Sequence, residues 1–103
     1  MEQFMIYLEE QTARLREEGR RLAADDRRDE GDLSKIRANV YGICKSVLQV
    51  QGSEKAKTIL TGLHGTWSKN LEIAREHDDV KQAVIEEIKI ETLSEILRKL
   101  EEV

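Results

Sequence analysis

Apolar residues recur at intervals of three and four along nearly the whole chain, and this periodicity limits the possible folds more than any other feature. The spacing matches the 3.6-residue turn of an α-helix and places the apolar side chains on one face. Proline, which breaks helices, is absent, and aromatic residues make up only 4% of the chain. Proteins built from strands usually carry more aromatic residues and turn prolines. The sequence therefore predicts an all-α protein.

Three interruptions divide the apolar pattern into four helical segments. The first is the charged stretch DDRRDEGD, residues 25–32, and the second is QGS, where Gly52 can take the positive φ that ends a helix. The third is HDDV, where Asp79 can cap a new helix and Gln82 stands at the position that completes a capping box. We therefore predict helices at about residues 2–25, 29–50, 54–76 and 80–102.

The short connections between these segments favour antiparallel neighbours, so we predict a single domain folded as an antiparallel up-down four-helix bundle. A chain of 103 residues is long enough to bury one core without disulfides or metal. An alternative is a long coiled-coil rod in which the first two helices are continuous, because one register runs through both of them at seven-residue spacing: Leu8, Leu15, Leu22, Asp29, Ile36, Ile43 and Val50. Gly31 is a poor helix-interior residue, which favours the hairpin.

The charges are distributed unevenly along the chain. Residues 32–71 carry two acids against six bases, whereas residues 1–31 and 72–103 carry an excess of acids. This pattern fits either a basic surface for an anionic partner or helices of opposite charge packed side by side. The basic residues are spread over two predicted helices and the sequence pI is about 5.3, so we do not expect nucleic-acid binding.

The sequence offers no sign of secretion or of membrane insertion. Cys44 is the only cysteine and cannot form an internal disulfide, and the chain opens on MEQFMIYLEEQ rather than on a basic and apolar signal segment. No apolar run reaches the roughly 18 residues that a membrane span needs. We therefore predict a cytoplasmic protein.

Motifs for catalysis and for cofactor binding are absent from the sequence. It contains no glycine-rich phosphate loop and no nucleophile elbow. Cys44 falls in the middle of an apolar face, which favours a buried thiol over a nucleophile. His64 and His77 lack the second histidine or the glutamate that a helical zinc site would supply. We predict no catalytic residue, no cofactor and no metal ligand.

One polar cluster is a candidate site. If the second predicted helix extends backwards, the acids of the charged stretch share a face with an arginine and a tyrosine, and a core-facing arginine needs a carboxylate partner such as Glu30 or Glu18. The candidate polar pocket consists of Asp26, Asp29, Glu30, Arg37 and Tyr41. The competing interpretation is an exposed turn beside an arginine with one structural ion pair.

The last predicted helix carries two apolar stripes, whereas a small bundle needs only one per helix. We predict that the second stripe, containing Ile90, Leu93 and Leu97, forms the interface of a homodimer. The alternative is that this helix occupies a more enclosed place in the fold.

These observations favour a non-enzymatic interaction or adaptor module that self-associates and binds another protein. The alternative is a ligand-dependent or divalent-metal-dependent enzyme that uses the carboxylates of residues 25–32.

Overall fold

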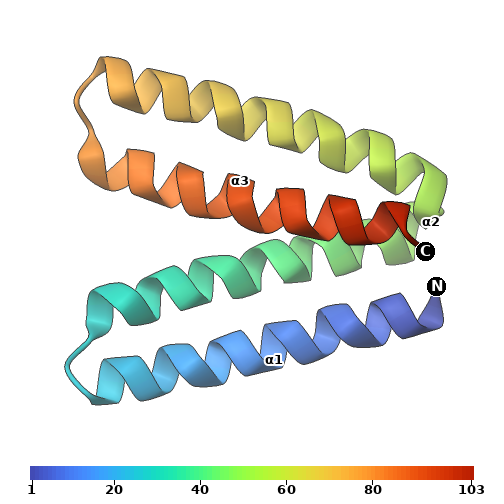
Figure 1. The fold of residues 1–103 in the computed structure, drawn as a ribbon, viewed down its shortest axis with the longest axis horizontal. Helices are drawn as coiled ribbons and strands as arrows, with labels where there is room; N and C mark the ends of the chain where they lie inside the picture. Colours follow the sequence, from blue (N-terminus) through green and yellow to red (C-terminus); the bar gives the residue numbers. More distant parts are fainter.

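The computed structural model describes all 103 residues, from Met1 to Val103, and contains only helices. Helix α1 spans Glu2–Ala24, α2 spans Arg28–Glu76 and α3 spans Val80–Glu101 (Figure 1). The all-α prediction is confirmed. None of the three helices carries an apolar segment long enough for a bilayer crossing.

The structure has three helices where the sequence predicted four, because α2 includes both central segments, with a reversal of the chain at Gly52 between them. Residues 28–76 all belong to α2, and the only non-helical backbone angles inside it are those of Gly52, with φ 79° and ψ 167°. Glycine adopts such angles at little steric cost, so a single residue reverses the chain without a separate loop. The two arms of α2 on either side of Gly52 consequently run antiparallel (Figure 1).

The turn between α1 and α2 excludes the continuous rod. Helix α1 ends at Ala24, Asp26 takes a φ of 62°, and α2 begins at Arg28. Aspartate tolerates this left-handed conformation better than most residues. The charged stretch therefore contains the turn of a helical hairpin.

Helix α2 is the centre of the fold. Both α1 and α3 pack against α2, whereas α1 and α3 scarcely touch each other. The two chain termini lie at the same end of the molecule (Figure 1). There the Lys99 ammonium lies 5.2 Å from the centre of the Tyr7 ring, so a cation–π contact links α3 to α1.

The core is a single cluster to which all three helices contribute. Most of its side chains come from α2, which is consistent with the central position of that helix: Phe4, Leu8 and Leu15 from α1; Ala38, Val40, Tyr41, Cys44, Leu48, Ala56, Leu60 and Trp67 from α2; Leu93, Ile96 and Leu100 from α3. The predicted N-cap of the last helix is confirmed, because the Asp79 carboxylate accepts a hydrogen bond from the Gln82 backbone N–H at 3.1 Å.

Helices α1 and α2 approach most closely through two glycines. A Cβ atom on Gly31 would lie 2.7 Å from the carbonyl oxygen of Gly19, and one on Gly19 would lie 3.1 Å from the carbonyl oxygen of Gly31. Ser34 and Ala38 continue the small buried face of α2 beside them. Gly19, which interrupts the apolar stripe of the first helix, is therefore a contact point that only glycine fits without movement.

Candidate functional site

The five residues of the predicted polar pocket do not gather in one place. Asp26, Asp29 and Glu30 are exposed, Arg37 is half-buried and Tyr41 is buried. Asp26 and Glu30 lie in the turn and in the first turn of α2, where their carboxylates face solvent. Sequence reasoning assigned them an inward face because it extended α2 backwards through a turn that the chain uses to reverse.

The ion pair predicted for Arg37 is absent. Glu30 instead pairs with Arg27, and Glu18 pairs with Arg14 at 3.3 Å. Both partners lie three or four residues away on the surface, so the pairs form locally within the helical segments. The acids considered as partners for Arg37 are therefore already engaged elsewhere.

Tyr41 lies at the junction of α1 and α2, away from the charged turn. Its ring meets the Tyr7 ring edge-on at 6.1 Å, and the two hydroxyl groups are 3.5 Å apart. Burial raises the pKa of Tyr41 above its ordinary value, and the contact with Tyr7 raises it further. Tyr41 thus acts as a structural residue that joins α1 to α2.

The residues of the predicted homodimer interface pack inside the chain. Leu93 is completely buried, and Ile90 and Leu97 are partly buried against the core cluster. The second apolar stripe of α3 is covered because α3 packs on α2. The surface on which the sequence placed self-association is therefore largely used by the protomer itself.

The cysteine is buried, and one of the two histidines makes a contact between helices. Burial raises the pKa of the Cys44 thiol to about 12, so the thiol stays protonated at neutral pH. His64 joins α2 to α3 through a 2.9 Å hydrogen bond between its Nε2 and the Ser94 hydroxyl. His77 is exposed at the end of α2. No group of three or more histidine, cysteine, aspartate or glutamate side chains converges on one point where a metal could bind.

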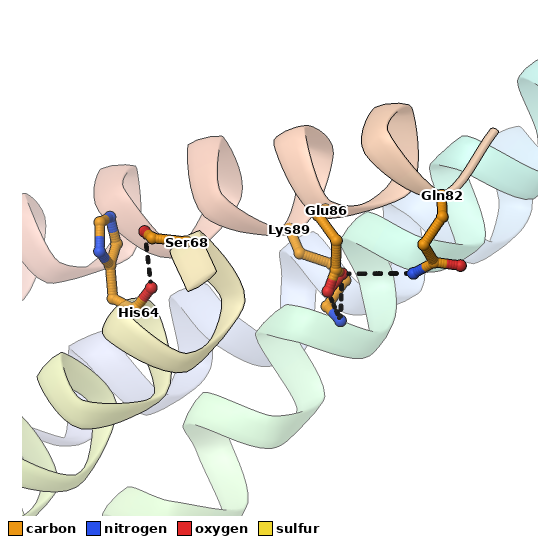
Figure 2. A network of polar contacts seen from close by, with 5 residues as sticks. All are labelled: His64, Ser68, Gln82, Glu86 and Lys89. Atoms are coloured by element: carbon orange, nitrogen blue, oxygen red, sulfur yellow. Dashed lines mark hydrogen bonds and ion pairs between the residues drawn. The ribbon is translucent and has the colours of Figure 1, made fainter. Parts of the chain in front are cut away.

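A buried ion pair on α3 escaped the sequence analysis. Glu86 is only 1% exposed, and both of its carboxylate oxygens accept hydrogen bonds from the Lys89 ammonium, at 2.8 and 3.0 Å. The Gln82 amide donates a third, longer hydrogen bond to Glu86 at 3.5 Å (Figure 2). Lys89 also lies 4.6 Å from the centre of the Trp67 ring, which adds a cation–π contact with the second arm of α2.

This ion pair does leave a sequence signal. Glu86, Leu93 and Leu100 are seven residues apart, so they share one face of α3, and both leucines are in the core. An acid in register with two core leucines is a local conflict that a buried partner can resolve. Lys89, one turn away, supplies that partner.

Two surface grooves flank the first arm of α2. One lies between α1 and α2 and is lined by Arg16, Asn39, Gly42, Ile43, Ser46 and Val47. The other lies between α2 and α3 and is lined by Asp29, Asp32, Leu33, Ile36, Lys81, Val84 and Ile85. Asp29 of the predicted polar pocket therefore lines the second groove, and this groove is largely apolar.

Aliphatic side chains of the first arm of α2 line both grooves. Ile36 lines one groove and Ile43 lines the other, and seven residues are close to two full turns of a helix. Val50 is 77% exposed and Ile43 is 39% exposed, while two further side chains are partly buried. We name this surface the α2 outer stripe, which consists of Ile36, Ile43, Val47 and Val50.

Comparison with known protein families, with characterised proteins and with solved structures found no match.

Proposed function

We propose that this chain is a non-enzymatic helical interaction module that self-associates and binds another protein. The observation that carries the proposal is the α2 outer stripe, which leaves aliphatic side chains at the surface along the central helix of the fold. Ile43 and Val50 are exposed on this face and Ile36 and Val47 are half-buried beside them, and exposed apolar surface marks protein–protein contact sites.

The position of the stripe supports this role. Helix α2 is held on two sides by α1 and α3, and its core face is closed by large buried side chains such as Leu48 and Leu60. The outer face therefore belongs to a rigid element, and a partner that docks on it meets a surface that is formed before binding. Such preorganisation lowers the entropic cost of association.

The charged groups around the stripe add the polar rim that such sites usually have. Arg16 and Asn39 line the groove between α1 and α2, and together with Arg20 and Lys35 they also line a further, polar groove. Asp29 and Asp32 line the groove between α2 and α3. A partner on this face therefore meets aliphatic side chains with charged groups of both signs beside them.

Affinity capture from the native host tests the module. Tagged wild-type protein is compared with Ile43→Asp and with the control Ile73→Asp, which changes an isoleucine of similar exposure, 46% against 39%, on the other arm of α2. We expect a specific host protein to be retained by the wild type and by Ile73→Asp and to be lost with Ile43→Asp. Equal retention by all three proteins would contradict the proposal.

The metal-dependent enzyme remains the alternative function, and it makes a separate prediction. A real divalent-cation site among the carboxylates of residues 25–32 would raise the melting temperature of dialysed protein when Mg²⁺, Mn²⁺ or Zn²⁺ is added at millimolar concentration. The exposed, outward-facing positions of Asp26 and Glu30 lead us to expect no such rise.

A further inference from the structure

We propose that Gly52 is a hinge at which the chain exchanges halves with a second copy of itself. One half consists of α1 and the first arm of α2, residues 1–51, and the other consists of the second arm and α3, residues 53–103. In the exchanged dimer α2 runs straight through Gly52, and each half packs on the complementary half of the other copy. The inference rests on the self-association in the proposed function, and it needs no exposed apolar surface.

Each half is a helical hairpin with polar contacts of its own. In the first half the Lys45 Nζ lies 2.9 Å from the Glu9 Oε1, which joins the first arm of α2 to α1. In the second half the His64 Nε2 lies 2.9 Å from the Ser94 hydroxyl, which joins the second arm to α3. Each hairpin therefore keeps its own helix-to-helix contacts when the two halves separate.

The contact between the two halves is apolar. No side-chain hydrogen bond or ion pair joins residues 1–51 to residues 53–103. The halves share the one core cluster, and the cation–π contact of Lys99 with Tyr7 crosses between them. A second copy carries the same surfaces, so its complementary half can restore this packing in full.

The bent and the straight forms of α2 differ at a single residue. Gly52 has φ 79° and ψ 167°, a combination that is essentially restricted to glycine, and every other residue from 28 to 76 is helical. Gly52 is exposed, and a Cβ atom added to it would meet nothing within 4 Å, so the bend is open on that side. The reversal has no loop that could relax, and connections this short favour exchange between copies.

The substitution Gly52→Ala should drive the exchange. Alanine is disfavoured at the angles of the bend and favoured in a straight helix, and each dimer contains two such positions. We therefore expect the association constant to rise at least about a hundredfold. Gly62→Ala is the matched control, because it makes the same change in the same helix, at helical backbone angles and with nothing within 4 Å of the new Cβ. It should leave association unchanged.

Sedimentation velocity of the full chain at about 10–500 μM measures the association. We expect the wild type to contain both the 11.9 kDa protomer and a dimer of twice that mass, and Gly52→Ala to be dimeric throughout. A flexible glycine–serine insertion after Gly52 gives the closed protomer a loop and should abolish the dimer. Circular dichroism verifies that each variant is helical.

A distance within one chain distinguishes exchange from the association of closed copies. Arg28 and Glu76 are exposed at the two ends of α2, and in the closed protomer both ends lie at the same end of a molecule only 37 Å long (Figure 1). A straight α2 would separate them by about 72 Å. Dyes attached to Arg28→Cys/Glu76→Cys, with buried Cys44 unlabelled, report this distance by Förster transfer in an excess of unlabelled chain. We expect transfer to fall in the dimer.

Three results would overturn the inference: a wild type without dimer over the whole concentration range, equal association of Gly52→Ala and Gly62→Ala, or a dimer in which transfer is as strong as in the protomer. The third result would leave the self-association of the proposed function standing, through closed copies. A wild-type protomer that still captures a host protein through Ile43 would overturn the exchange and leave protein binding standing. Exchange together with equal capture by the wild type and Ile43→Asp would support the hinge and contradict the proposed binding surface.

Discussion

Helix α2 is joined to its two neighbours by opposite means. At the α1 contact the backbones come close through Gly19 and Gly31, and small side chains fill the rest of the crossing. At the α3 contact, Trp67 and Leu93 occupy the space between the helices, together with the buried ion pair of Glu86. Added side-chain volume should therefore destabilise the α1 contact, whereas removed side-chain volume should destabilise the α3 contact.

Removal of a large side chain from the α3 contact should have the largest effect. We expect Leu93→Ala to lower the free energy of unfolding by about 3 kcal/mol, because the side chain is fully buried and leaves a cavity. Urea denaturation measures the change, and Leu97→Ala, at a partly buried position, should cost clearly less. A loss that depended on protein concentration would show that Leu93 belongs to an interface between copies, as the sequence predicted, and would contradict its place in the core.

Removal of one partner of the Glu86–Lys89 ion pair should lower the free energy of unfolding nearly as much as Leu93→Ala does. We expect Lys89→Met to cost about 2–3 kcal/mol, because the Glu86 carboxylate would remain buried without a counter-charge, and the cost is moderated by the 22% exposure of Lys89. The double variant Glu86→Leu/Lys89→Met should recover most of the loss. The control Arg75→Met removes the exposed Arg75–Glu87 bridge and should cost less than about 0.5 kcal/mol in the same urea titration.

Glycine substitutions should have opposite signs in the two kinds of position. We expect Gly31→Ala to destabilise the protein by about 1–2 kcal/mol, because its Cβ would meet the Gly19 carbonyl oxygen and force the helices apart. Gly42→Ala should instead stabilise it by up to about 1 kcal/mol, because the new methyl group meets nothing and alanine favours the helix. The melting temperatures of both variants, compared with that of the wild type, test these two expectations. Stabilisation by Gly31→Ala would show that the α1 contact is looser than described.

The smallest effect concerns pH and the core thiol. The pKa of Cys44 is raised from 9.0 to about 12, so between these values the unfolded chain releases a proton that the folded chain keeps. The stabilisation that the protonated thiol provides is therefore fully present below pH 9 and is lost as the pH rises toward 12. At pH 10 the loss amounts to about 1 kcal/mol. Comparison of the wild type with Cys44→Ala from pH 8 to 10 measures it. An equal pH dependence in both proteins would mean that the thiol is not buried.

The parts of the fold that depend on local chemistry could be predicted from the sequence. Apolar periodicity identified the helical class, and the turn at Asp26, the bend at Gly52 and the cap at Asp79 all fall where the sequence placed its interruptions. The count of helices failed because the sequence shows that Gly52 permits positive φ but does not show whether a loop accompanies it. One residue proved sufficient for the reversal.

The location of the candidate site depends on which apolar helix faces are covered by neighbouring helices. The sequence alone does not specify this. Leu93 and Ile43 both belong to apolar stripes, yet Leu93 is buried and Ile43 is exposed, because α3 packs with its second stripe inward while no helix covers α2 at Ile43. The heptad of Ile36, Ile43 and Val50 was visible as a register, but its meaning changed once the turn at Asp26 separated it from α1.

The sequence by itself determined the helices, their breaks and their caps, since these depend on backbone preferences and on side chains within a few residues. The tertiary structure alone decided that Gly19 meets Gly31, that Glu86 is buried beside Lys89, and that the outer face of α2 stays open. Burial is a property of neighbours that lie far apart in the chain, and a helical pattern specifies a face without specifying what covers it.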